Sequence, residues 1–297
     1  MGSPSNDIIP ADWSQWSATK PTVIEPLTGG LTNQSFLISA DNTLLVLRIN
    51  SAISTELDLN RTAEAQALQL ASAANIAAEL VYCDPHYGYL VTRYLLGDSW
   101  LPTEQGLAQL AVLLQAIHQL PAIDTELNIN AKVASYWRTV NPQLECISAL
   151  KKLDKNIRQH IAKATSLSNG LCLCHNDLLI DNLMTIGKGN NKAQLLAIDW
   201  EYAAMADCFY ELAVIVEGHS LNLSQQNNLL TNYLNRPVSD EDWQRLYHWR
   251  VIYNYFTLLW YVVQFSMRAM RGPSIKQQIN QQIQYLSGLV EQGMRAR

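Results

Sequence analysis

Hydrophobic residues recur along this chain with two different periods, and the change between them predicts its organisation. In the first third, short runs rich in β-branched and aromatic residues are separated by turn residues, which is the pattern of β-strands. Helical spacing interrupts these runs once, between about residues 54 and 75, where Leu57, Ala65, Leu68 and Ala71 recur on one face. The predicted strands occupy residues 22–27, 34–39, 43–50, 79–83 and 88–95.

Beyond Gly97 the helical period dominates, and only one β-rich island interrupts it. The predicted helices occupy residues 103–119, 132–140, 143–166, 240–269 and 274–292. We therefore expect an α+β fold with two lobes. A small β-rich N-terminal lobe would comprise residues 1–97, and a larger, mainly helical C-terminal lobe would comprise residues 98–297. A cleft between two such lobes is a usual place for a ligand.

Composition narrows the function classes without identifying one. The chain has 297 residues, of which 48% are hydrophobic and 16% are charged, so a mainly disordered chain is excluded. The formal net charge of −5 argues against a nucleic-acid-binding protein, because binding many phosphates requires a basic face. A nucleotide is not excluded, since metal ions and backbone amides can hold its few phosphates. The expected partner is a small molecule, and no pattern sets an oligomeric state.

Cysteine usage and the lack of long apolar runs in the sequence predict a cytoplasmic location. The five cysteines include no CxxC pair, and no signal segment opens the chain. The longest apolar run, 251–263, is too short to span a bilayer, so no membrane partner is expected. Cys172 and Cys174 alternate just before His175, but no second ligand pair accompanies them. We interpret both cysteines as small core residues rather than as a metal site.

The β-rich island, with a strand before residue 175 and a hairpin over 182–198, carries the clearest chemistry. Phosphoryl transfer to a hydroxyl needs a carboxylate that accepts the hydroxyl proton and two oxygen ligands for Mg²⁺. Asp177 fits the first role, and Asn182 and Asp199 fit the second, because the hairpin brings their strand ends together. We count His175 among the catalytic residues as the one that fixes the loop by hydrogen bonding. The His175–Asp177 segment alone is typical of a turn, and Asp199 alone is typical of a strand end. Their order and spacing together indicate a phosphoryl-transfer site.

This island resembles the HxD-x4-N motif of the aminoglycoside phosphotransferase and choline kinase superfamily, and the resemblance covers about residues 26–286. It implies a bilobal protein-kinase-like fold with ATP in the cleft and Mg²⁺ as cofactor. Within the superfamily, the sequence after Ile198 and the FYELA string after Cys208 resemble the choline kinase and thiamine kinase branches. Glu211 stands where the superfamily usually has an Asp, so its role in anchoring a helix is an expectation.

A glycine-containing string between the first two predicted strands is the candidate phosphate loop. Adjacent glycines let the backbone approach phosphates, although most such pairs are simple turns. The GGLTNxS string nevertheless resembles the nucleotide loop of choline and thiamine kinases. The candidate nucleotide-binding residues in it are Gly29, Gly30, Thr32, Asn33 and Ser35.

A kinase also needs a cation on its third strand to hold the ATP phosphates, paired with a carboxylate on a helix. Arg48 is the one basic residue in a suitable strand, and choline and thiamine kinases tolerate Arg there. We expect Glu64 to be its partner, with Glu56 as the second choice. The alternative is a surface arginine on an edge strand. The segment Val91 to Gly97 would then be the hinge that contacts adenine.

The acceptor pocket is the least determined part of the sequence. Eight aromatic residues lie between Trp243 and Tyr261, and four of them share one helical face, which fits either a core stripe or a pocket for an ammonium group. The candidate acceptor-binding residues are Trp260, Glu201 and Glu217, with Asp207 as a further carboxylate near the motif.

The sequence thus predicts an ATP- and Mg²⁺-dependent phosphotransferase that acts on the hydroxyl of a small, cationic metabolite. Choline or ethanolamine is the first expectation, thiamine the second and an aminoglycoside the third. A hypothesis from another class is a catalytically silent nucleotide-binding protein, which the missing lysine on the third strand would favour.

Overall fold

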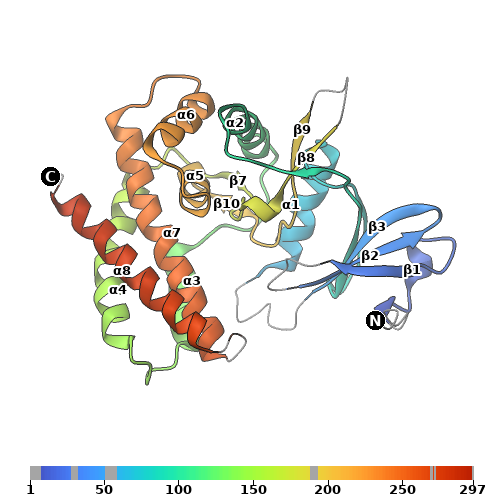
Figure 1. Cartoon of the computed structure of the whole chain (residues 1–297), viewed down its shortest axis with the longest axis horizontal. Coiled ribbons are helices and arrows are strands. Elements are labelled where there is room, and N and C mark those ends of the chain that lie inside the picture. Colours follow the sequence, from blue (N-terminus) through green and yellow to red (C-terminus); the bar gives the residue numbers. More distant parts are fainter. Residues whose placement is uncertain are drawn as a thin grey trace.

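The computed structural model describes residues 8–27, 33–50, 59–187, 193–267, 270 and 272–295 (Figure 1). Its largest sheet is antiparallel, with the strand order β1-β2-β3-β5-β4, and its strands agree with the five predicted from alternating hydrophobic positions. Ile38, Leu47 and Val91 are fully buried in the core of this sheet. The strands are β1 (Thr22–Leu27), β2 (Gln34–Ala40), β3 (Thr43–Ile49), β4 (Leu80–Cys83) and β5 (Tyr89–Arg93).

Helix α1 (Arg61–Ala73) lies between β3 and β4, as predicted, but it begins later than the sequence pattern indicates. The side chain of Asn60 accepts hydrogen bonds from the backbone N–H groups of Thr62 and Ala63, which fixes the helix start. The predicted start near residue 54 lies in 51–58, outside the described residues. The expectation of a continuous helix from there is wrong, because residues 59 and 60 are not helical.

Seven further helices make up most of the C-terminal part, to the left in Figure 1. Five of them agree with the predicted helices. The remaining two, α5 and α6, were not predicted: residues 209–216 of α5 are all buried, so no amphipathic period is visible, and α6 is rich in Asn and Gln. The helices are α2 (Glu104–His118), α3 (Ile129–Thr139), α4 (Ile147–Ser166), α5 (Cys208–Gly218), α6 (Leu223–Leu234), α7 (Asp240–Ser266) and α8 (Pro273–Arg295).

The β-rich island forms two small sheets between the large sheet and the helices. The predicted hairpin is present: β8 (Leu183–Ile186) pairs antiparallel with β9 (Gln194–Ala197), and Leu183 lies opposite Ala197. The N–H of Ile198 donates to the carbonyl of Asn182 at 3.0 Å, so residues 182 and 199 share one end of the hairpin. Two further short strands complete the sheets: β6 (Asp98–Ser99) pairs with β8, and β10 (Ala204–Ala206) pairs with β7 (Cys172–Cys174).

The chain passes from the large sheet to the helical part at a close backbone contact. A Cβ atom at Gly97 would lie 2.6 Å from the carbonyl oxygen of Thr185 in β8, so only glycine fits there. Beyond it, a single apolar cluster unites α1 with α2 and α5, and it includes the buried rings of Trp100 and Trp200.

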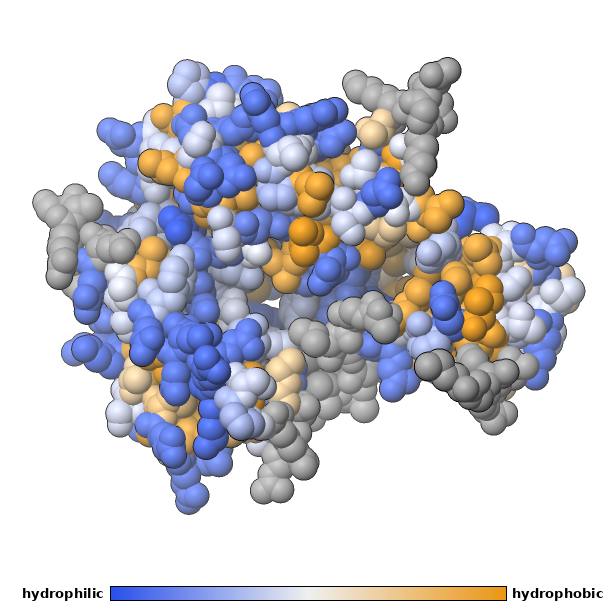
Figure 2. All heavy atoms as spheres, viewed as in Figure 1, coloured by the Kyte–Doolittle hydropathy of each residue, from blue (hydrophilic) through white to orange (hydrophobic). Residues whose placement is uncertain are grey.

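Figure 2 shows mostly hydrophilic side chains over the helices and a hollow near the centre of this face. Within the described ranges, none of the helices combines the length and the apolar character needed to cross a membrane.

Candidate active site

The loop after β7 is fixed by His175, whose imidazole connects the two halves of the predicted motif. Its Nε2 lies 2.9 Å from the carbonyl oxygen of Ile198, and its Nδ1 accepts the N–H of Asp177 at 3.3 Å. Only a neutral ring with the proton on Nε2 satisfies both contacts. Burial lowers the pKa of His175, which favours this neutral form. The geometry therefore gives His175 a positioning role between Asp177 and the strand that leads to Asp199.

Asp177 and Asn182 are in direct contact. The amide nitrogen of Asn182 donates to the backbone carbonyl of Asp177 at 2.8 Å and to its carboxylate oxygen Oδ2 at 2.9 Å. Removal from water raises the pKa of Asp177 well above its usual value, and the negative charges of Asp199 and Glu201 add to this effect. A carboxylate in such a place accepts a proton more readily than one in water.

Backbone strain occurs at two positions of the site. Asn176 and Asp199 both have left-handed backbone conformations, with φ of 66° and 62°. Such conformations cost energy for residues other than glycine and persist where the surrounding contacts impose them. The amide nitrogen of Asn176 donates to the carbonyl oxygen of Tyr202 at 3.0 Å, which is one such contact.

Arg48 on β3 joins the large sheet to this site. Its guanidinium forms an ion pair with Glu64 of α1 and donates to Oδ1 of Asp199 at 2.7 Å. Arg48 is 7% exposed and Glu64 is 2% exposed, so neither is a surface residue. The pairing of Arg48 with Glu64 is the one predicted from the sequence, whereas the second choice, Glu56, lies outside the described residues.

Arg61 completes the charge network, and the sequence reasoning missed it. Its Nη1 binds Glu64 at 2.8 Å and Glu201 at 3.1 Å, and its Nη2 donates to Oδ1 of Asn33 at 2.9 Å. The amide of Asn33 in turn donates to Glu201 at 2.7 Å. The signal that could have identified Arg61 is its position three residues before Glu64, on the same face of α1.

Glu201 therefore differs from its sequence-based expectation as an acceptor-binding carboxylate. In the structure the carboxylate of Glu201 accepts a hydrogen bond from Asn33 and forms an ion pair with Arg61. Both partners lie in the N-terminal part of the chain, where the nucleotide site is predicted. Ser35 on β2 lies opposite Arg48 in the strand register. The other predicted loop residues, Gly29, Gly30 and Thr32, lie outside the described residues.

Two further predicted acceptor residues lie on or beside α7. Glu217 forms an ion pair with Arg250 and accepts the hydroxyl of Tyr285 at 2.8 Å, so its charge is already matched. Trp260 is half-buried and packs against Tyr261, with ring centroids 5.2 Å apart. Asp207, also considered from the sequence, caps α5 and pairs with Arg245.

The aromatic face of α7 divides into two parts. Trp249 and Phe256 are buried and lie 5.6 and 6.0 Å from the ring of Tyr210, so they belong to the core. Tyr253 and Trp260 are half-buried. Of the two alternatives from the sequence, a core stripe therefore describes the first pair, and a ligand pocket stays a prediction for the second.

Glu211 of α5 binds the catalytic loop with one carboxylate oxygen and helix α2 with the other. One carboxylate oxygen accepts the N–H of Asn176 at 2.8 Å, and the other lies 2.6 Å from Nε2 of His118 on α2. The Nδ1 of His118 contacts the hydroxyl of Tyr233 at 2.8 Å. Glu211 is fully buried, so these contacts hold the loop to two helices in the interior.

Replacing Glu211 with Ala is expected to lower the free energy of unfolding by about 3 kcal/mol, because two hydrogen bonds to a buried charge are lost. Urea denaturation measures this change. Glu211→Gln retains an acceptor for Asn176 and should cost less. Glu104→Ala, at an exposed position in the first turn of α2, is the matched control. Equal losses for Glu211→Ala and Glu104→Ala would contradict the anchoring role.

Comparison with known proteins agrees with this arrangement. Protein LicA of Haemophilus influenzae is 29% identical over 216 residues, which is 70% of this chain and 62% of LicA, so the match spans less than two thirds of that relative. A thiamine kinase of Salmonella paratyphi B is 29% identical over 147 residues, which is 48% of this chain and 47% of the relative. The crystal structure of choline kinase LicA from Streptococcus pneumoniae superposes with a TM-score of 0.76 at 20% identity, covering 91% of this chain and 95% of that one.

These comparisons and the site geometry lead to one assignment. The structural neighbour has the bilobal fold that the sequence predicts, and the model of the phosphotransferase enzyme family matches residues 23–249. That range includes the described large sheet, the catalytic loop and the charge network around Arg48. The chain belongs to the phosphotransferase enzyme family, whose matched relatives here include small-molecule kinases.

Proposed function

We propose that this protein transfers the γ-phosphoryl group of ATP to the hydroxyl of a small cationic metabolite, with choline or ethanolamine as the first candidates. The observation that carries this proposal is the contact set of Asp177, Asn182, Asp199 and Arg48 at one end of a hairpin. Phosphoryl transfer depends mainly on positioning and on charge stabilisation, and this set supplies groups for both. The reduced cysteines and the use of ATP support a cytoplasmic location.

The residues take distinct parts in the proposed reaction. As the acceptor oxygen bonds to the γ-phosphorus and the bond to ADP breaks, Asp177 accepts the hydroxyl proton. Arg48 binds phosphate oxygens through its two-pronged guanidinium, and Glu64 holds it in place. The amide oxygen of Asn182 is not used in its contacts with Asp177, so it and the carboxylate of Asp199 are a fitting donor set for Mg²⁺. When bound, Mg²⁺ would neutralise charge on the phosphates.

Aromatic rings near Asp177 favour a cationic acceptor. Burial raises the pKa of Tyr202 and of Tyr253, and the negative charge of Asp177 adds to this effect at both. The backbone carbonyl of Tyr202 accepts the amide of Asn176, the residue before Asp177, at 3.0 Å. The ammonium of Lys132 already lies 5.7 Å from the ring centroid of Tyr202 and 5.3 Å from that of Tyr136. Each aromatic ring has two faces, so the face of Tyr202 that Lys132 does not contact is the one proposed for the ammonium group of a substrate. Thiamine, which also carries a positive ring and a primary hydroxyl, is the second candidate.

Release of ADP from ATP and Mg²⁺ tests the proposal, with choline, ethanolamine, thiamine and kanamycin as separate acceptors. Release that depends on choline or ethanolamine supports it. Release with thiamine alone would retain the substrate class but replace the first candidates with the second. Release with kanamycin alone would overturn the substrate class but retain the reaction. Binding of MgATP with no release for any acceptor would instead favour a silent nucleotide-binding protein.

Removing the ring of Tyr202 should weaken a cationic acceptor specifically. We expect Tyr202→Leu to raise KM for choline by about 3- to 30-fold, because a cation–π contact contributes about 0.5–2 kcal/mol, and to leave KM for ATP within about twofold. Tyr202→Phe retains the ring face and should retain KM. Steady-state kinetics measures both constants. A rise of KM in Tyr202→Phe as large as in Tyr202→Leu would show that the hydroxyl, rather than the ring face, is important.

A further inference from the structure

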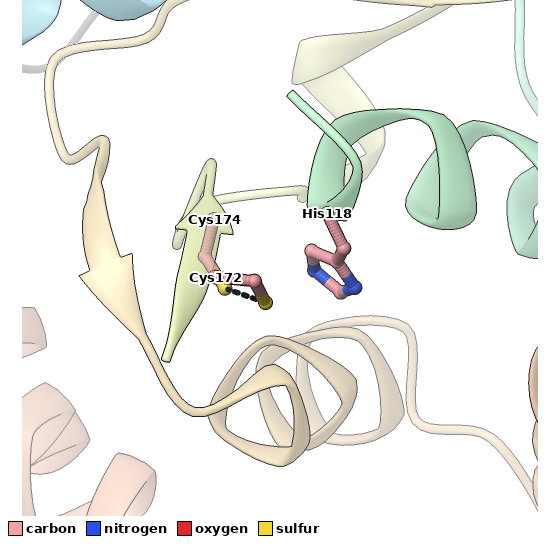
Figure 3. A group of neighbouring side chains, drawn as sticks. All are labelled: His118, Cys172 and Cys174. Carbon is pink, nitrogen blue, oxygen red and sulfur yellow. Dashed lines mark hydrogen bonds between the residues drawn. The ribbon is translucent and has the colours of Figure 1, made fainter. Parts of the chain in front are cut away.

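A cluster of sulfur and nitrogen ligands lies under the catalytic loop, and the proposed reaction does not use it. The side chains of Cys172 and Cys174 on β7 point to the same side of the strand and face His118 at the end of α2 (Figure 3). One ligand atom from each of these three residues lies within 4.8 Å of the other two. The sequence shows only the cysteine pair, because His118 is more than fifty residues away along the chain.

The spacing of the two thiols fits a tetrahedral metal. Their sulfur atoms are 3.7 Å apart. Two thiolates bound to Zn²⁺ at about 2.3 Å with a tetrahedral angle would have their sulfur atoms about 3.8 Å apart. Both sulfurs lie only 3.7 Å from the carbonyl oxygen of Ala206, so β10 holds the pair in this geometry. The thiols are therefore already arranged as a zinc-binding pair.

Neighbouring residues supply the rest of a metal site. Cysteine and histidine are the usual ligands of zinc, and three protein ligands with a water molecule in the fourth position form a tetrahedral site. The carboxylate of Glu211 lies 2.6 Å from Nε2 of His118, and ligating histidines usually have a carboxylate on the ring nitrogen that faces away from the metal.

We propose that His118, Cys172 and Cys174 bind one Zn²⁺ ion. His118 ligates through Nδ1, which then exchanges its contact with the Tyr233 hydroxyl for the metal. Each cysteine that binds releases its thiol proton to solvent, and no oxidant or reductant takes part. The ion ties α2 to β7.

Zinc at this position restrains the catalytic loop through residues that are bonded to the loop or hydrogen-bonded to it. Cys174 directly precedes His175, and Glu211, the outer partner of His118, also accepts the N–H of Asn176. The metal therefore restrains both ends of the segment that leads to Asp177. This is a positioning role, since the cluster touches none of the residues proposed to bind phosphate.

Metal analysis of the full chain tests the site directly. Protein is purified without chelators from medium supplemented with zinc, and zinc per chain is measured by mass spectrometry. We expect about one zinc per chain, and less than about 0.2 in Cys172→Ser and Cys174→Ser, because each variant removes a ligand. Cys83→Ser and Cys146→Ser, which alter free cysteines on β4 and beside α4, are the matched controls and should retain the zinc.

Cobalt substitution keeps the test decisive if the serine variants fail to fold. The unaltered chain is stripped with a chelator and titrated with Co²⁺. We expect thiolate-to-cobalt charge-transfer bands together with the visible bands of tetrahedral Co²⁺. Asp199→Ala should retain these bands, because that residue belongs to the proposed magnesium site. Absence of thiolate bands in the unaltered chain, or zinc content unchanged in both cysteine variants, would overturn the proposal.

Discussion

Replacing Asp177 with Asn is expected to lower kcat by about 10³-fold, because the variant retains the shape of the side chain but loses the group that accepts the acceptor proton. The contact with Asn182 runs from the Asn182 amide to the Asp177 side chain, and the amide oxygen of an asparagine can still accept it. MgATP binding should therefore change by only a few fold. Initial rates of ADP release and calorimetric titration with MgATP measure the two quantities.

Asp181→Asn is the matched control for this substitution. Asp181 carries the same side chain four residues further along the loop, but it is exposed. The control should retain the kcat of the unaltered protein, and it accounts for any general effect of losing a negative charge near the site. If Asp177→Asn turned over as fast as Asp181→Asn, Asp177 would not be the base.

Much of the fold could be predicted because its elements repeat a simple pattern. The five strands of the large sheet and the β8–β9 hairpin alternate or cluster apolar residues between turn signals, and the structure confirms them. Helix α5 escaped prediction because it is buried on every side, and a helix without a polar face has no helical period to detect. The start of α1 was misplaced because Leu57 extends the helical spacing to the N-terminal side of Asn60, whose side chain caps the helix.

The site was predictable where its residues are close in sequence and obscure where the fold brings distant residues together. Asp177, Asn182 and Asp199 lie within one island, so their spacing alone indicated a common place. His118 has no such spacing, because it reaches Glu211 from a separate helix, and Arg61 has it toward Glu64 but not toward Glu201. Glu201 shows a related limit: its place near the motif suggested an acceptor-binding residue, but its carboxylate accepts a hydrogen bond from Asn33, which is far away in the sequence.

The charge network also determines which arginine matters for stability. Arg48 forms ion pairs with Glu64 and Asp199, whereas the ion pairs described for Arg61 join it to Glu64 and Glu201. Without Arg48, the carboxylate of Asp199 would lose its described cationic contact while Asp177 remains nearby. The loss would thus raise repulsion at the point where phosphates are proposed to bind.

Arg48→Ala is accordingly expected to lower the free energy of unfolding by about 3 kcal/mol, because removal of one partner leaves a buried charge poorly compensated. It should also lower kcat/KM for ATP by about 10²–10³-fold, the usual effect of losing one group that stabilises transition-state charge. Urea denaturation and steady-state kinetics measure these two losses. Arg48→Lys keeps the charge but loses the two-pronged fork, so it should recover more of the stability than of the activity.

The exposed pair of Arg93 and Glu79 provides the control for Arg48. Their atoms are 2.6 Å apart, close to the Arg48–Asp199 distance, but their side chains are 48% and 60% exposed. Exposed ion pairs contribute little, so Arg93→Ala should lower the free energy of unfolding by less than about 1 kcal/mol. Equal costs for Arg48→Ala and Arg93→Ala would mean that the buried network does not hold the sheet to the catalytic loop. A large loss confined to Arg48→Ala would show that burial, rather than distance, gives this arginine its effect.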